Sequence, residues 1–151
     1  MVEPITEASP ADIERWHRTF APRFFNRTWE LMDRIDLDAD EIDEMLASAF
    51  AQRAHWYAVG DARKRAIADW QVSRAAILGG HPLLARRFAE RSLAGSTGLD
   101  PFVAAIARAA AAVDDVGTFE AHILAARELS LQVTDPQERR TIDADLDQMC
   151  L

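Results

Sequence analysis

The chain has 151 residues, of which 49% are hydrophobic and 28% are charged, a composition that suits one folded domain and excludes wholesale disorder. Its net charge of −8 argues against a nucleic-acid partner, because such binding depends on neutralising phosphates with a basic surface. No apolar run is long enough to span a membrane, the first residues lack the features of a signal peptide, and the single cysteine, Cys150, has no disulfide partner. We therefore expect a cytoplasmic domain without membrane contact.

Charge is unevenly distributed along the chain. Residues 1–50 carry −7 (5 basic and 12 acidic residues), residues 51–91 carry +5 (8 and 3), and residues 92–151 carry −6 (4 and 10). The basic middle contains Arg63-Lys64-Arg65, Arg86-Arg87 and Arg91. These side chains either offset the acidic segments, cover a self-association surface, or line a groove for an acidic peptide.

Start and stop signals predict helices throughout. Ser9-Pro10, Asp100-Pro101 and Asp135-Pro136 each place an N-cap before a proline, and Glu138 stands where it would complete a capping box. Glycines stand where helices would stop. The first two expected segments are alternatively one helix bent at Pro22. The segments are roughly 10–21, 24–35, 39–58, 62–78, 82–94, 101–115 and 118–133, with a last helix near 136–148.

The apolar pattern supports an all-α fold. Ile42, Met45 and Phe50 follow a helical period, and no segment of useful length alternates with period two. Nine of the twelve aromatic residues precede residue 71, which predicts the densest core in the early helices. The same cluster is alternatively the lining of a ligand groove.

The small residues Ser73, Ala85 and Ser92 have the spacing at which paired helices of a tetratricopeptide repeat approach closely, with a turn at Gly80. A weaker copy of this pattern follows, with small residues at Ala109, Gly117 and Ala121 but a glutamate, Glu128, at the third small position. Residues 62–133 thus resemble a degenerate tetratricopeptide pair. The resemblance implies helical hairpins stacked as a short solenoid of seven to eight helices.

The chain also resembles small bacterial proteins that have a tetratricopeptide-like fold and no assigned activity. The segments that carry this resemblance are Phe25-Asn26-Arg27-Thr28-Trp29-Glu30-Leu31, His55-Trp56, Trp70-Gln71-Val72-Ser73-Arg74, the Gly79 turn and Ala125-Ala126-Arg127-Glu128-Leu129. It implies one domain over 1–151, with aromatic-rich helices at 1–35, hairpins over 39–133 and a capping helix at 136–148. It implies no function.

No motif predicts a metal, a cofactor or a catalytic centre. The acidic run 36–40 lacks the glycine and the chelating glutamate of a calcium loop, since Glu41 and Ala47 occupy those positions. It is better explained as the start of a helix capped by Asp38 or Asp40. The four histidines lack ligand spacing, and the sequence has neither a phosphate-binding loop nor a nucleophile elbow.

One position stands out because Arg74 falls on the apolar stripe of helix 62–78, where a guanidinium needs a partner or a groove. A hairpin would bring the end of helix 39–58 close to it. Either residues at the end of helix 39–58 form an anion or carboxylate site together with Arg74 and its neighbours, or Arg74 pairs internally with Glu30 or Glu44. The candidate site consists of His55, Trp56, Trp70 and Arg74.

The leading functional hypothesis is a non-catalytic helical-repeat module that binds a protein partner or a second copy of itself. A small-molecule or anion sensor around Arg74 is the alternative. An enzyme whose groups converge on His55 and Arg74 is the weakest of the three.

Overall fold

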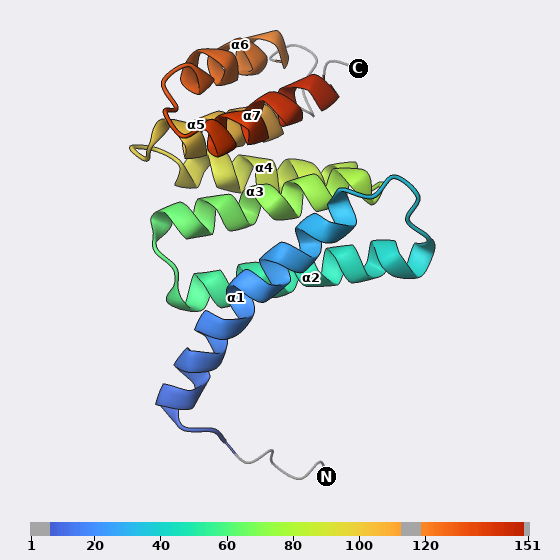
Figure 1. The fold of residues 1–151 in the computed structure, drawn as a ribbon, viewed down its shortest axis with the longest axis vertical. Helices are drawn as coiled ribbons and strands as arrows, with labels where there is room; N and C mark the ends of the chain where they lie inside the picture. The colour runs from blue at the N-terminus through green and yellow to red at the C-terminus, as the bar shows by residue number, and fades with distance from the viewer. Residues whose placement is uncertain (1–6, 113–118, 150–151) are drawn as a thin grey trace.

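The structure is a computed structural model, and it describes residues 7–112 and 119–149. These residues form seven α-helices and no β-strand, which confirms the all-α prediction (Figure 1). The helices are α1 (Pro10–Met32), α2 (Ala39–Val59), α3 (Ala62–Leu78), α4 (Pro82–Gly95), α5 (Pro101–Ala112), α6 (Phe119–Ser130) and α7 (Pro136–Met149).

Of the two alternatives at Pro22, the structure shows a single helix and not two separate segments. Pro22 lies inside α1, which continues through it as one helix of 23 residues. Proline removes one helical hydrogen bond, a loss that costs least at an exposed position, and Pro22 is exposed. The helix ends at Met32, earlier than predicted, where the Asp33 backbone N–H bonds the carbonyls of Leu31 and Trp29.

The helix starts follow the caps in the sequence. The Ser9 side chain caps α1, and Asp38 caps α2 in a capping box with Glu41. The acidic run is therefore a helix start, as interpreted. The turn from α3 to α4 needs Gly80, whose φ of 81° lies in the left-handed region.

Consecutive helices pair along the chain. The closest packing joins α1 with α2, α3 with α4, and α5 with α6, while α7 packs on α5 and α6 (Figure 1). Each odd-numbered helix also contacts the next odd-numbered helix, so α1, α3, α5 and α7 form a continuous layer. We call this layer the inner helices.

The small residues predicted to allow close packing do so between α3 and α4. Ser73, Ala85 and Ser92 are all buried. The Ser73 hydroxyl donates to the Ala85 carbonyl at 2.8 Å, and the Ser92 hydroxyl donates to the Ala66 carbonyl at 2.8 Å. These hydrogen bonds require the two helices to lie nearly in backbone contact.

The second copy of the pattern does not mark an equivalent contact in α6. Ala121 and Glu128 are both exposed there, so no close helix approach demands a small side chain at either. The side chain of Ala109 and the whole of Gly117 lie outside the described part of the chain.

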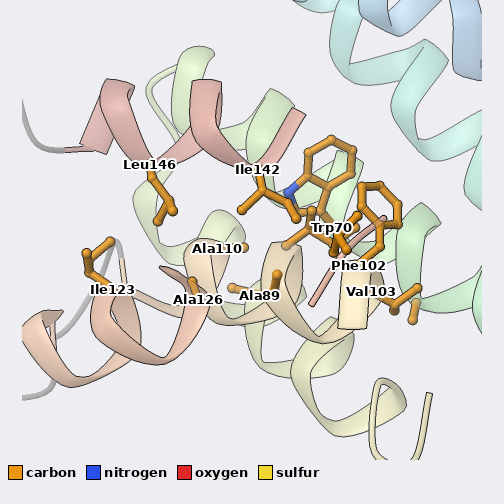
Figure 2. Close-up of a cluster of buried hydrophobic side chains, with 13 residues drawn as sticks. Trp70, Ala89, Phe102, Val103, Ala110, Ile123, Ala126, Ile142 and Leu146 are labelled. Carbon is orange, nitrogen blue, oxygen red and sulfur yellow. The ribbon is translucent and has the colours of Figure 1, made fainter. Parts of the chain in front are cut away.

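Two clusters of buried side chains hold the helices together. One joins α1, α2, α3 and α4 around Leu31, Met45 and Val72. The other joins α3 and α4 to α5, α6 and α7, and Figure 2 shows Trp70 in it beside Phe102. The prediction that the early aromatics form the densest core is wrong, because Trp70 alone among those before residue 71 is fully buried.

Candidate functional site

Arg74 is buried and paired inside the protein. Its guanidinium Nε lies 3.2 Å from Oδ1 of Asp145, and the side chains of both residues are almost fully inaccessible. The Trp70 indole N–H donates to the other carboxylate oxygen of Asp145 at 2.9 Å. Burial raises the pKa of Asp145, and Arg74 and Trp70 oppose this rise. One carboxylate of α7 therefore anchors two of the predicted site residues of α3.

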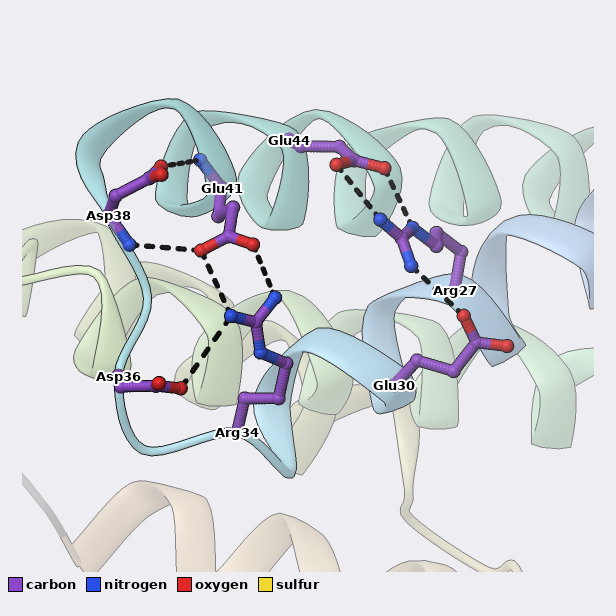
Figure 3. A network of polar contacts seen from close by, with 7 residues as sticks. All are labelled: Arg27, Glu30, Arg34, Asp36, Asp38, Glu41 and Glu44. Atoms are coloured by element: carbon purple, nitrogen blue, oxygen red, sulfur yellow. Dashed lines mark hydrogen bonds and ion pairs between the residues drawn. The ribbon is translucent and has the colours of Figure 1, made fainter.

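The prediction that Arg74 pairs with Glu30 or Glu44 is wrong. Both bind Arg27 instead, at 3.1 Å and 2.7 Å (Figure 3). The Arg27 hydrogen bonds hold the pKa of the Glu44 carboxyl below its ordinary value. The true partner of Arg74, Asp145, lies on the last helix, and neither helical period nor hairpin geometry connects such distant segments.

His55 and Trp56 make other contacts. His55 faces α1, where its Nδ1 lies 2.8 Å from Nδ1 of His17 and its ring stacks on Phe24 with centroids 5.9 Å apart. Burial, with a contribution from His17, lowers the pKa of His55. Trp56 lies under the Lys64 ammonium at 5.2 Å. Trp70 and Arg74 thus come together, and the structure gives no contact that joins His55 and Trp56 to them.

A groove of about 860 Å³ is lined by residues of all four inner helices, and we call it the α1–α7 groove. A smaller hollow of about 260 Å³, here the side hollow, shares the lining residues Trp29, Asp33, Gln137 and Thr141 with it. Trp70 lines the groove, whereas Arg74 lines the side hollow. Trp70 and Arg74, the two predicted site residues that lie together, thus border adjoining spaces.

Aromatic rings form one wall of the α1–α7 groove. Trp29 lies 5.4 Å from Trp70 between ring centroids, and Phe25 meets Trp29 edge-on at 6.5 Å. Trp70 is only 1% exposed and forms the floor, while Phe25 and Trp29 are half-buried and present part of their surface. Of the early aromatic residues, Phe25 and Trp29 therefore fit the alternative hypothesis that this cluster lines a groove.

The groove is acidic. Its lining contains four carboxylates and no basic side chain; the carboxylates are Glu30, Asp33, Asp135 and Glu138. Arg27 pairs with Glu30, and Arg63 pairs with Glu138 at 2.7 Å. Among the described residues, Asp33 and Asp135 have no ion pair, although Asp135 accepts backbone N–H groups as the N-cap of α7. These two carboxylates leave the groove with a net negative charge.

Two arginines of the basic segment, Arg63 and Arg86, pair with acids within the fold. Besides Glu138, Arg63 pairs with Asp100 at 2.9 Å and so ties α3 to the start of α5. Arg86 pairs with Glu90 at 3.0 Å on the surface of α4. Of the three explanations open from the sequence, these contacts favour charge compensation for both arginines.

A second buried carboxylate, Asp69, was not predicted. It accepts hydrogen bonds from Arg53 and from the Tyr57 hydroxyl, both at 2.5 Å, and the Arg53 guanidinium lies 4.0 Å from the Tyr57 ring centroid. These contacts fasten α2 to α3. An acid next to Trp70 in a helix interior is a signal of the same kind as Arg74, and it could have revealed this buried network.

Comparison with protein-family models, with curated proteins and with solved structures finds no match to this chain. Within residues 7–112 and 119–149, no three His, Cys, Asp or Glu side chains gather in a way that would hold a metal ion. None of the described helices combines the length and the apolar character required to cross a bilayer. Function is therefore inferred from geometry alone.

Proposed function

We propose that this chain is a non-catalytic interaction module that binds a segment of another protein in the α1–α7 groove. The observation that carries the proposal is a groove of about 860 Å³ bordered by aromatic and polar side chains. Sites that hold ligands commonly measure about 300–1,000 Å³ and combine apolar walls with a few polar groups. Its lining residues lie in α1, α3, α5 and α7, apart from Asp33 and Asp135, which flank α1 and α7.

The half-buried aromatics supply the contact surface. Trp29 and Phe25 each have one side packed against the fold and part of their surface open to the groove. Aromatic side chains in such positions contribute a large share of the binding energy at protein interfaces. Trp29 rests on the buried Trp70, with 5.4 Å between the ring centroids.

The geometry favours this function over an anion sensor at Arg74. The side hollow is lined by two arginines, Arg74 and Arg140, but also by Asp33 and Asp145. Asp145 lies against the Arg74 guanidinium, so an incoming anion would meet a compensated charge. The enzyme hypothesis loses its basis too, because His55 contacts His17 and Phe24 rather than Arg74.

Self-association is a second candidate, and it rests on a different surface. The N-terminal half of α1 extends past α2 (Figure 1), and its side chains Ile13 and Trp16 are 42% and 46% exposed. Light scattering at increasing protein concentration tests it. A dimer that dissociates in Trp16→Gln supports this surface, whereas a monomer at all concentrations excludes it.

A displayed random-peptide library tests the groove. Peptides selected on the wild-type protein should lose at least tenfold in affinity for Thr141→Trp, which places a large ring in the groove lining. Leu124→Trp is the matched control, because Leu124 is exposed on α6 and absent from that lining. Failure to select peptides, or equal binding to both variants, would show that the groove is not the binding surface.

A further inference from the structure

The charge and the aromatic wall of the α1–α7 groove indicate what kind of segment it binds. We infer that the partner enters the groove with an arginine side chain, whose guanidinium lies against Trp29 and pairs with Asp33. This inference rests on the proposed function and specifies its ligand.

Trp29 and Asp33 are held together in a fixed relationship. They stand one helical turn apart at the end of α1, where the Asp33 backbone N–H donates to the Trp29 carbonyl at 3.0 Å. Both residues line the groove and the side hollow. An aromatic surface and a carboxylate are therefore presented side by side where the two spaces meet.

The carboxylate is available to a partner. Arg27 and Arg63 compensate two of the four groove acids, and Asp135 caps α7. Asp33 is exposed and has no ion pair among the described residues. Because no basic side chain lines this groove, an arriving cation meets no repulsion from its walls.

The protein already uses the same arrangement with its own arginines. The Arg63 guanidinium lies 5.4 Å from the ring centroid of Phe102 while it pairs with Glu138, and both of those residues line the α1–α7 groove. Arg53 lies in the same way over Tyr57 while it bonds to Asp69. Trp29 and Asp33 form a third pair of ring and carboxylate, and no described arginine of this chain occupies it.

Arginine suits this pair better than lysine. A planar guanidinium stacks on an aromatic face and at the same time offers two parallel N–H groups to a carboxylate, which a compact ammonium does not. The side hollow constrains the approach, since Arg140 lines it and would repel a guanidinium. The arginine therefore enters from the larger groove.

The experiment uses synthetic copies of peptides that were selected on the wild-type protein and that fail to bind Thr141→Trp. In each peptide one arginine at a time is replaced by citrulline, which keeps the shape of the side chain and removes its charge. We expect one such replacement to lower affinity at least tenfold, as measured by the fluorescence of the protein's tryptophans. The same replacement should have little effect on binding to Asp33→Asn, because the two changes remove the same contact.

Two further variants separate a direct contact from the general charge of the protein. Asp43→Asn removes the same charge from an exposed position of α2 outside the groove lining, and it should leave affinity nearly unchanged. Arg140→Glu should raise affinity several-fold. Equal losses for Asp33→Asn and Asp43→Asn would overturn the inference.

The two proposals fail in different ways. If peptides bind in a groove-dependent manner but contain no arginine, or bind equally well with citrulline, the inference is wrong and the interaction function stands. If no peptide depends on the groove, the proposed function itself is wrong.

Discussion

Arg74 of α3 and Asp145 of α7 face each other inside the protein, with 3.2 Å between the guanidinium Nε and the carboxylate Oδ1. Asp145 also accepts the indole N–H of Trp70. The pair therefore connects the middle of the chain to its last helix through polar contacts that water scarcely reaches. Removing one partner leaves the other charge buried and uncompensated.

Arg74→Ala should lower the free energy of unfolding by about 3–5 kcal/mol, because Asp145 would remain buried without its cation. Urea denaturation monitored by circular dichroism measures this loss. Arg140→Ala is the control, since Arg140 is exposed on α7 and should change stability by no more than about 0.5 kcal/mol. A loss below about 1 kcal/mol for Arg74→Ala would mean that water reaches Asp145 readily, contrary to the observed burial.

Local chemistry explains how much the sequence could predict. Ser9, Asp38 and Gly80 act within a few residues of their own position, and the caps and the turn that they indicate are all observed. Ser73 and Ala85 marked the close contact between α3 and α4 because helices adjacent in the chain pack together.

The site depends on contacts between distant segments, which the sequence did not specify. Asp145 lies far along the chain from Arg74, and the α1–α7 groove joins residues of α1 to residues of α7. Helical period predicts which face of a helix is buried, but it does not predict which helix covers that face. For the same reason, the sequence predicts His55 close to Arg74, whereas in the structure His55 faces His17.

The pairing of His55 with His17 predicts a dependence of stability on pH. A hydrogen bond between two Nδ1 atoms requires one imidazole to donate and the other to accept, so it is lost when both rings are protonated. Burial, followed by the neighbouring His17, lowers the pKa of folded His55 below its unfolded value of 6.5. The unfolded chain then binds the proton more readily, and the stability contributed by neutral His55 is lost as the pH falls below that value.

Thermal unfolding at several pH values between 7.5 and 5, chosen to span the titration range of histidine, measures this effect. The wild-type protein should lose stability more steeply toward low pH than His55→Gln does. His81→Gln provides the comparison, because His81 is exposed in the turn before α4 and should keep the wild-type slope. Parallel curves for the wild type and His55→Gln would contradict the pairing.

Two glycines should respond in opposite directions to the same substitution. Gly80→Ala should destabilise the protein by about 1 kcal/mol, because a φ of 81° is unfavourable for a residue with a Cβ. An added Cβ meets nothing within 4 Å there, so the cost is conformational and not steric. Gly95→Ala should stabilise by about 0.5 kcal/mol, since Gly95 is helical and its Cβ would only touch Ala66 at 3.8 Å. Chemical denaturation of both variants checks the signs.

The contact between α3 and α4 predicts the largest effect of a single added side chain. Ala85 is buried, and its carbonyl accepts the Ser73 hydroxyl at 2.8 Å, which leaves no room for an indole between the helices. Ala85→Trp should therefore cost at least about 3 kcal/mol and lower the melting temperature by several degrees. Ala94→Trp, at an exposed position of the same helix, adds the same ring without entering this contact and should melt close to the wild type. Similar melting curves for the two variants would mean that α3 and α4 are not packed as closely as the hydrogen bond requires.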